Sequence, residues 1–388
     1  MEKVVITIEE LKKMIRNNEE SKIDEIDIVT SGTCGIMSGT LGIFHIPFSE
    51  KFKKAEKIYL NGIKGHPGPC PNEFLGSVDC TVYGTCHDGN YGGGFLFKDL
   101  ISGKSIDVVT VSENKEYSKT FTLEEIPTAK LIGTRTAFKN YVAITNTGNP
   151  LNTIFHRKMI KSGEASFSGC GEFNPLQNMN SCEKYITGKK ILVNGAEGII
   201  LGYGTRSSEL KPNIMVSASM HEMDSYYIGG FITSNGPEIF NTIAVPISVN
   251  EQNKEYLKTL DENIELPLTN VIGRTVIGTG NYSEVWKDAQ LRPNIDINRC
   301  RACDSCEAQK MCPTNAIIRM DSFGKRTLPN EDCFGCGVCV DSCNYGVYKM
   351  NRKSILDIKI TCRQSDRVRA LKLSKELKKR IQKEEFIF

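Results

Sequence analysis

The sequence predicts an α+β fold, with a sheet-rich domain over residues 1–294 and a small cysteine-rich domain, inserted or appended, over residues 295–350. Short runs rich in β-branched and aromatic residues recur along the first domain, and Gly-rich turns separate many of them. Strands are expected at residues 4–8, 26–30, 58–60, 107–111, 141–145, 191–193, 198–201, 214–217 and 242–249. Helical patterns are fewer, at residues 8–18 and 253–260, so sheet should dominate.

Composition is ordinary for a globular protein. The 388 residues suggest two or three domains, on a prior of about 150 residues each. Hydrophobic residues make up 39% and charged residues 24%, and the net charge of +3 gives no argument for a nucleic-acid or membrane partner. The chain has no uncharged apolar run of about 18 residues, and its charged N-terminal stretch lacks the apolar core of a signal peptide. We therefore expect a cytoplasmic protein.

Cysteine is the unusual component. Fifteen cysteines in a cytoplasmic chain do not suggest a disulfide framework, because the cytosol keeps thiols reduced. Metal ligation or thiol chemistry is the expected use of so many cysteines. Eight of the fifteen lie between Cys300 and Cys343, and this clustering favours metal ligation in the cysteine-rich segment, residues 295–350.

The eight clustered cysteines form two similar runs. The first is Cys300-x2-Cys303-x2-Cys306-x5-Cys312-Pro313, and the second is Cys333-x2-Cys336-x2-Cys339-x3-Cys343. Three thiolates at such intervals hold three corners of one 4Fe–4S cubane, and the fourth cysteine of the run reaches the other cluster, as in bacterial ferredoxins. The predicted ligands are Cys300, Cys303, Cys306 and Cys343 for cluster 1, and Cys312, Cys333, Cys336 and Cys339 for cluster 2.

The two runs depart from the usual spacing in two places. Five residues precede Cys312 instead of three, which suggests a small loop, and Asn344 follows Cys343 where a proline is usual. A pair of zinc sites is the alternative, but zinc favours paired C-x2-C units over two triple runs. Residues 316–320 and 346–350 should form the short strands of this module. Two neighbouring clusters imply electron transfer in one-electron steps.

A helix is expected after the cysteine-rich segment. Ala370, Leu373, Leu377 and Ile381 recur at helical spacing among lysines and arginines. We interpret residues 355–388 as a tail that packs back on the first domain and completes it, so that the cysteine-rich segment is an insertion. A helix lying on a membrane surface is the alternative, and it would need a broader apolar face.

Residues 30–39 (TSGTCGIMSG) are a first chemical candidate in the large domain. They follow an apolar run, are Gly-rich and contain Cys34. Such a strand-to-loop edge presents backbone N–H groups to an anion, or it is a simple tight turn with a buried cysteine. The glycine content alone does not decide between these two interpretations.

Residues 66–94 are a second candidate, for a further metal site. The candidate ligands are Cys70, Cys80, Cys86 and His87, and their spacings match no familiar ligand pattern. A third candidate is the stretch around Cys170, which lies between two glycines and is therefore expected to be sterically open. Glu172 and Asn174 follow it closely and could orient a substrate. Cys170 is either a nucleophile or a small buried hydrophobic residue.

Five segments spread over most of the chain outside the cysteine-rich segment carry a family resemblance. They are TSGTCGIMSG, VDCTVYGTCHDGNYGGGFLFKDLISGK, NYVAITN, GCGEFNPLQN and RQSDRVRALKLSKELKKRI. They resemble the archaeal homocysteine-biosynthesis family, and with the two-cluster module the chain looks closest to the methanogenesis marker 16 metalloproteins. The resemblance implies sulfur transfer onto aspartate semialdehyde to give homocysteine, by way of a cysteine persulfide and with electrons from a ferredoxin.

The chain also departs from this family pattern. The resemblance implies cysteines in and just before the stretch NYVAITN, where this chain has Val142 and Ala137. Conversely, Cys34 and Cys170 stand where the pattern has other residues. Either the thiol that carries sulfur has moved, with Cys170 as its new position, or the reaction differs.

The sequence hypothesis is therefore a redox-linked sulfur-transfer enzyme. Cys170 would accept sulfur as a persulfide, and a small carbonyl substrate would lie near Cys34 or His87, with electrons arriving through the two clusters. The expected partners are sulfide or another sulfur donor and a low-potential electron donor, without nucleic acid or membrane. The alternative is a protein without small-molecule turnover, which passes electrons or sulfur to an enzyme of methanogenesis or helps to mature one of its cofactors.

An iron count tests the two-cluster prediction. Anaerobically reconstituted protein should contain about eight iron atoms and eight acid-labile sulfides per chain, because each cubane holds four of each. Zinc in place of iron would contradict the cluster prediction, and clearly more iron would support a third metal site at Cys80, Cys86 and His87 with Cys70.

Overall fold

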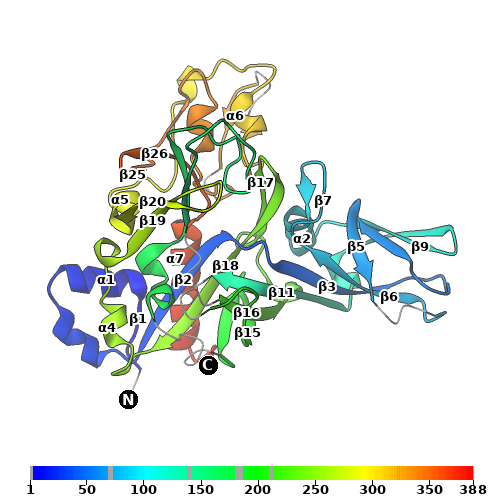
Figure 1. The fold of residues 1–388 in the computed structure, drawn as a ribbon. Coiled ribbons are helices and arrows are strands. Elements are labelled where there is room, and N and C mark those ends of the chain that lie inside the picture. The colour runs from blue at the N-terminus through cyan, green and yellow to red at the C-terminus, as the bar shows by residue number, and fades with distance from the viewer. Residues whose placement is uncertain are drawn as a thin grey trace.

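The computed structural model describes residues 3–68, 73–137, 142–179, 187–208, 213–320, 322, 324–329 and 331–387. Within these residues the strands form one 14-stranded sheet, one 6-stranded sheet and three 2-stranded sheets. Figure 1 shows a central body, an arm of strands that extends to one side, and the cysteine-rich segment at the top. Strands dominate and helices are few, so the predicted α+β class is confirmed.

One end of the large sheet combines strands from the beginning and from the later part of the first domain. β1 (Val5–Thr7) pairs in parallel with β2 (Ile28–Ile36), which pairs antiparallel with β18 (Gly236–Ser248). Between β1 and β2 lies α1 (Ile8–Arg16), which begins directly after β1 because Thr7 caps its N-terminus in a capping box.

The order of the large sheet is β1-β2-β18-β14-β15-β16-β11-β3-β6-β5-β4-β9-β10, and β17 also pairs with β18. The remaining strands are β3 (Thr40–Pro47), β4 (Lys57–Leu60), β5 (Ile63–Pro67), β6 (Ser77–Tyr83), β9 (Ile106–Ser112), β10 (Lys115–Phe121), β11 (Thr128–Ala137), β14 (Lys190–Val193), β15 (Ala196–Tyr203), β16 (Asn213–Ser219) and β17 (Gly229–Thr233). The arm consists of β3 to β6, β9 and β10, with the small hairpin β7 (His87–Asp88) and β8 (Tyr91–Gly92) and with α2 (Gly93–Ile101).

Short helices connect these strands. They are α4 (Lys254–Leu257), α5 (Tyr282–Trp286) and the 3-10 turns η1 (Glu20–Glu25), η2 (Leu123–Glu125), η3 (Gly171–Phe173), η4 (Pro175–Asn178), η5 (Met220–Glu222) and η6 (Asp261–Asn263). The expected helix at residues 8–18 is confirmed as α1, and that at 253–260 is confirmed as the shorter α4.

The second sheet receives strands from both sides of the cysteine-rich segment. Its order is β20 (Val276–Asn281), β19 (Glu265–Asn270), β12 (Val142–Thr145), β13 (Glu164–Ser168), β26 (Ile358–Arg363) and β25 (Ser354–Ile355). β20 precedes the cysteine-rich segment, whereas β26 follows it and pairs in parallel with β13. Phe167, Tyr282 and Trp286 form an edge-to-face aromatic group in the core of this sheet.

The cysteine-rich segment has little regular structure. It contains two 2-stranded sheets, β21 (Asn294–Ile295) with β24 (Tyr348–Lys349) and β22 (Ile318–Arg319) with β23 (Arg326–Thr327). α6 (Glu307–Lys310), η7 (Ile297–Arg299) and η8 (Val338–Asp341) complete it. The short strands expected within residues 316–320 and 346–350 are therefore present as β22 and β24.

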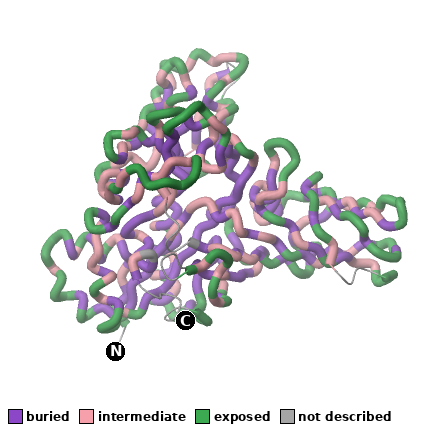
Figure 2. Tube along the Cα trace, viewed as in Figure 1, coloured by how far each residue is buried: buried purple, intermediate pink, exposed green. Residues whose placement is uncertain are grey.

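The last helix, α7 (Arg367–Gln382), lies against β2 and β18 in the central body (Figure 1). Ala370, Leu373, Leu377 and Ile381 are all buried, which confirms the predicted amphipathic helix that packs on the first domain. Figure 2 shows this helix bordered by buried chain on its inner side. Nowhere in the described ranges does a helix reach the length and apolarity that a bilayer crossing needs.

The segment 30–39 is not the loop edge that its glycines suggested. β2 continues through it to Ile36, so Cys34 lies within a central strand, directly opposite Thr242 of β18. The glycines are needed for close approach. A Cβ on Gly32 would lie 2.2 Å from the Ala370 carbonyl oxygen, and one on Gly35 would lie 3.0 Å from that of Gln364.

Gly32→Ala tests this contact between β2 and α7. The added methyl group would meet helix backbone, which cannot rotate away, so we expect the free energy of unfolding to fall by about 1–3 kcal/mol. Urea unfolding measures the change. Gly148→Ala is the matched control, because nothing lies nearer than 3.8 Å to its added Cβ, and an equal loss in both variants would contradict the prediction.

Candidate functional site

Two buried thiols meet where β2 leaves its pairing with β1. The Cys170 thiol donates to the carbonyl oxygen of Cys34 at 3.6 Å. It also contacts the hydroxyl of Thr33, while the Cys34 thiol contacts the hydroxyl of Thr242. Each cysteine is only 1% exposed. We call Cys34 and Cys170 the thiol pair.

Burial dominates the electrostatics of the thiol pair. It raises the pKa of Cys34 well above its ordinary value, and the Asp366 carboxylate raises it further. Burial also raises the pKa of Cys170, against the opposing effect of the Arg367 guanidinium. Both groups are therefore protonated thiols at neutral pH, and either needs to lose its proton before it attacks sulfur or carbon.

Cys170 is not sterically open, so that interpretation of its two glycine neighbours is wrong. Gly171 has a φ of +63°, and a Cβ there would lie 2.3 Å from Asp261 Oδ1. The glycine thus permits a tight turn and close packing, which seal the thiol inside the protein.

Glu172 belongs to a buried ion network. Its carboxylate pairs with Arg16 at 2.8 Å, and its backbone N–H donates to Asp261 Oδ1 at 2.9 Å. Asp261 in turn pairs with Arg367 at 2.7 Å. Burial raises the pKa of Glu172, and burial lowers the pKa of the neighbouring Lys12 to about 8. These contacts hold the turn after Cys170 against α1 and α7, so the geometry gives Glu172 a positioning role.

Asn174 lines a small cavity beside the thiol pair. The other lining residues are Ser31, Gly32, Thr33, Thr136, Ile243 and Val245. Thr136 Oγ1 is buried and has no hydrogen-bond partner among the residues that the structure describes. Because Thr33 contacts both the cavity and the Cys170 thiol, the cavity offers polar groups to a small molecule next to that thiol.

The predicted cluster ligands lie near one another in the cysteine-rich segment. Cys336 and Cys339 lie close enough to Cys312 for electrostatic interaction, as does Cys333. Burial raises the pKa of Tyr348, and so do the neighbouring thiols of Cys339, Cys306, Cys343 and Cys300. Sequence spacing puts Cys303 between Cys300 and Cys306, in a half-buried position.

Backbone groups around these thiols suit iron–sulfur clusters. The N–H groups of Ala316 and Gly335 donate to Cys312 Sγ and Cys333 Sγ, each at 3.3 Å, and such bonds tune cluster potentials. Among the described residues, no three His, Cys, Asp or Glu side chains stand close enough to hold a single metal ion.

Residues of the second cysteine run pack in the same hydrophobic cluster as the thiol pair. Phe334 packs edge-on against Phe231 and at a tilt on Phe240, with ring centroids 5.1 and 5.0 Å apart. Cys34, Cys170, Cys336 and Cys362 share one hydrophobic cluster with these rings. Cys362 of β26 is a residue that sequence reasoning missed, and its only signal was its place immediately before the motif RQSD.

Residues 363–366, which we call the RQSD connector, join the two cysteine sites. The Arg363 N–H donates to the Cys336 carbonyl oxygen at 2.9 Å, and the Asp366 N–H donates to that of Cys34 at 3.1 Å. The Ser365 hydroxyl accepts from the Gly169 N–H. All four residues of the connector are buried. A hydrogen-bonded path therefore runs from a predicted cluster 2 ligand to the thiol pair.

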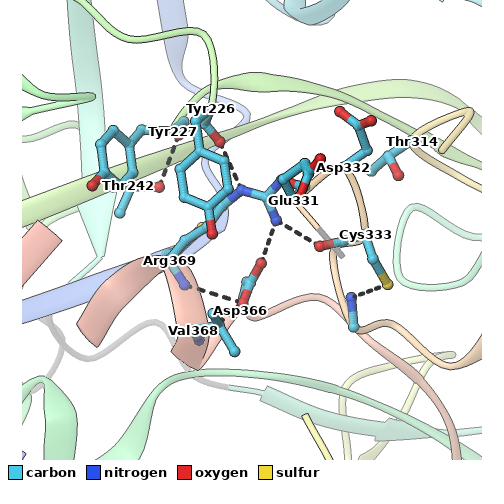
Figure 3. A network of polar contacts seen from close by, with 12 residues as sticks. Tyr226, Tyr227, Thr242, Thr314, Glu331, Asp332, Cys333, Asp366, Val368 and Arg369 are labelled. Atoms are coloured by element: carbon cyan, nitrogen blue, oxygen red, sulfur yellow. Dashed lines mark hydrogen bonds and ion pairs between the residues drawn. The ribbon is translucent and has the colours of Figure 1, made fainter. Parts of the chain in front are cut away.

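Asp366 is the centre of an ion network at the start of α7 (Figure 3). Its carboxylate is fully buried and pairs with Arg369 and, at 2.9 Å, with Arg292. Arg369 also donates to the carbonyl oxygens of Cys333 and Glu331 at 2.8 and 2.7 Å, and of Tyr226 at 2.7 Å. The Arg369 guanidinium therefore connects α7 with the loop before β17 and with the cysteine-rich segment.

The remaining predicted site residues lie elsewhere. Cys80 is buried in β6, Cys86 is half-buried after it, and His87 is exposed on β7 in the arm, whereas Cys70 lies outside the described residues. Val142 begins β12 and is the direct cross-strand partner of Ser168, two residues before Cys170. Ala137 ends β11.

Known proteins resemble this chain over most of its length. The profile of a family described as homocysteine biosynthesis enzyme, sulfur-incorporation, matches residues 3–388. An uncharacterized protein of Methanocaldococcus jannaschii is 60% identical over 98% of this chain and 98% of its own length. An L-aspartate semialdehyde sulfurtransferase of Methanosarcina acetivorans is 28% identical over 72% of this chain and 59% of its own length.

A further relative matches a smaller part of the chain. It is an uncharacterized ferredoxin of Methanocaldococcus jannaschii, 32% identical over 76 residues, which are 19% of this chain and 42% of the relative. No solved structure matches the chain significantly.

Asp366→Asn tests the ion network at the start of α7. The substitution keeps the size of the side chain but leaves two guanidinium groups, of Arg292 and Arg369, without their shared counter-ion. We expect the free energy of unfolding to fall by about 3–5 kcal/mol, measured in urea.

Glu9→Gln is the matched control for Asp366→Asn. Its pair with Lys375 is about half exposed, so we expect a loss of about 1 kcal/mol or less. A small loss for Asp366→Asn as well would show that the buried network does not hold the helix in place.

Proposed function

The chain belongs to the family of sulfur-incorporating homocysteine biosynthesis enzymes, and from this premise we propose that it transfers sulfur to a small carbonyl substrate with electrons that pass through two 4Fe–4S clusters in the same chain. The substrate class is that of aspartate semialdehyde, on which a relative in this family is named to act. The observation that carries the proposal is the shared hydrophobic cluster of Cys34, Cys170 and Cys336.

Two clusters are proposed in the cysteine-rich segment, with the ligand sets that the spacing predicts. The likeness to a ferredoxin over 76 residues and the electrostatic contacts of Cys333, Cys336 and Cys339 with Cys312 support this assignment. When bound, the clusters supply electrons singly. Domain limits at residues 294 and 350, with residues 355–388 completing the first domain, are part of the same proposal.

Cys170 is the proposed sulfur carrier. The family resemblance puts a cysteine at position 142, and here Val142 stands directly across from Ser168, close to Cys170 in sequence. A thiol at position 170 would therefore lie in the same region of the structure as a thiol at position 142. Glu172 and the turn at Gly171 position it, and Asn174, Thr33 and Thr136 in the adjacent cavity offer hydrogen bonds to a bound molecule.

The proposed sulfur transfer to the aldehyde balances in atoms and electrons. A persulfide donor passes its outer sulfur to the Cys170 thiolate and leaves as a thiol. Two electrons and two protons then cleave the S–S bond and release hydrogen sulfide. Hydrogen sulfide adds to the aldehyde, and two further electrons and two protons convert the adduct to a thiol and water. Four electrons in all are needed, and clusters in the same chain provide a route for them.

A second candidate function is favoured by the closed geometry of the site. The thiols are 1% exposed and the cavity beside them is small, which suits a sulfur atom better than an amino-acid aldehyde. In this alternative the protein passes sulfur or electrons to a partner protein of methanogenesis and turns over no small carbonyl compound itself.

Homocysteine formation tests the first proposal. Reconstituted protein with glutathione persulfide, dithionite and aspartate semialdehyde should form homocysteine, detected by mass spectrometry. Cys170→Ser should lower the rate roughly 100-fold or more, because the covalent carrier is lost. Sulfide supplied in place of the persulfide should restore product in this variant, since it bypasses the carrier step.

Cys86→Ser is the matched control, because Cys86 lies between β6 and β7 of the arm, outside the cluster that holds the thiol pair, and should keep full activity. Unchanged activity in Cys170→Ser would show that another residue carries sulfur. No homocysteine from wild-type protein with a full iron content would favour the partner-protein alternative.

A further inference from the structure

We propose that Arg157, a residue of the large domain, is the counter-charge of cluster 2 and raises the reduction potential of that cluster. The inference rests on the proposed function, because it takes the ligand set of cluster 2 as proposed above. It deepens that function by naming a residue outside the cysteine-rich segment that makes cluster 2 easier to reduce.

The large domain contacts the chain on both sides of Cys312, a proposed ligand of cluster 2. Arg157 lies in the loop between β12 and β13, which Figure 1 shows beside α6. Its Nη2 donates to the Lys310 carbonyl oxygen at 3.0 Å, two residues before Cys312. The Ile232 N–H of β17 donates to the Pro313 carbonyl oxygen at 2.8 Å, directly after Cys312. These bonds fix the position of Cys312 relative to the large domain.

The loop around Arg157 is held by its two neighbours in the chain. His156 is buried, and its Nδ1 accepts from the Lys158 N–H at 2.9 Å, while its Nε2 bonds to the Thr361 hydroxyl at 2.9 Å. Burial lowers the pKa of His156 to about 4, so this ring is neutral at pH 7 and adds no charge. The Lys158 ammonium donates to the Asp341 carbonyl oxygen at 3.0 Å. The loop is therefore tied to β26 and to the cysteine-rich segment.

Arg157 differs from the other arginines near cluster 2, because it has no carboxylate partner among the residues that the structure describes. Arg292 and Arg352 lie near other proposed ligands of this cluster, but each of them forms an ion pair with an aspartate. The charged group that Arg157 faces is Cys312. A guanidinium paired with a carboxylate has little net charge, so Arg157 supplies positive charge that no acidic side chain balances.

Arg157 also has an unused hydrogen-bond donor. Its Nε is buried and has no hydrogen-bond partner within the described part of the chain. A buried donor of this kind calls for an acceptor, such as an ion or a bound group. Sulfur atoms at a 4Fe–4S cluster accept hydrogen bonds, and such bonds tune the reduction potential. The donor and the charge of Arg157 therefore both fit a cluster held by Cys312.

The sign of the effect follows from the charge of the cluster. Reduction adds one electron, and hence one negative charge, to the iron, the sulfide and the four thiolates. A nearby cation stabilises the reduced form more than the oxidised form, by an energy that falls with distance. Arg157 is half-buried, so solvent screens this energy only in part. Loss of the guanidinium should make cluster 2 harder to reduce.

Redox titration of the reconstituted full chain, followed by electron paramagnetic resonance, tests the inference. In Arg157→Gln the ratio of reduced to oxidised cluster 2 at a fixed potential should fall about tenfold, a shift of about 59 mV for a one-electron couple. Arg157→Lys keeps the charge and should stay close to wild type. Arg157→Met serves if the glutamine variant does not hold iron. The wave that moves or disappears in Cys303→Ser belongs to cluster 1, which assigns the other wave to cluster 2.

Arg274→Gln is the matched control. The Arg274 guanidinium lies over the Phe155 ring in the same loop, 4.5 Å from the ring centroid, and burial is the influence on its pKa, with no cysteine of the described ranges involved. Its loss should leave both potentials unchanged. A shift in Arg157→Gln no larger than in this control would overturn the inference, and so would an equal shift in Arg157→Lys.

The outcomes separate this inference from the proposed function. A selective shift of cluster 2 in a protein that forms no homocysteine supports the inference and contradicts sulfur transfer to aspartate semialdehyde. Homocysteine formation with unchanged potentials in Arg157→Gln supports the proposed function and overturns the inference. A single four-iron cluster whose potential falls in Arg157→Gln supports the counter-charge role and contradicts the two-cluster part of the proposed function.

Discussion

The buried carboxylate of Asp366 is the interaction on which the rest of this structure depends. This carboxylate accepts hydrogen bonds from the first turn of α7 and pairs with Arg292 and Arg369. The backbone N–H of Asp366 donates to the Cys34 carbonyl oxygen. Arg369 extends the network to the Cys333 loop. A buried charge is costly unless it is paired, so the large sheet, the last helix and the cysteine-rich segment are each required for the others to be stable in this arrangement.

This dependence explains why the thiol pair is so enclosed. Aromatic rings of the cysteine-rich loop and of β17 and β18 close one side of it, and the turn held by Glu172 closes another. This enclosure keeps water away from both thiols. The same burial holds both thiols in the protonated form, so the chemistry needs sulfur delivery or proton removal inside the protein rather than a permanently charged nucleophile.

Sequence patterns identified several local elements well. The helical spacing of Ala370 to Ile381 predicted α7, and most of the expected strands are present. The glycines of residues 30–39 and around Cys170 were misleading, because a glycine that permits a turn looks the same in sequence as one that permits close packing. Gly32 is of the second kind and Gly171, with its positive φ, is of both kinds, since each faces atoms from residues distant in the sequence. The only sequence signal of Cys362 was its place immediately before RQSD.

The sequence by itself determined the spacing of the eight cysteines, the α+β class and the family to which the chain belongs, because ligand spacing and hydrophobic period are properties of neighbouring residues. Only the tertiary structure decided which cysteines outside the two runs lie together. Cys34, Cys170, Cys336 and Cys362 are far apart in the chain, and they meet because β26 and α7 return to the sheets after the cysteine-rich segment and bring the RQSD connector between them. Such contacts follow from the packing of whole elements, which no local pattern encodes.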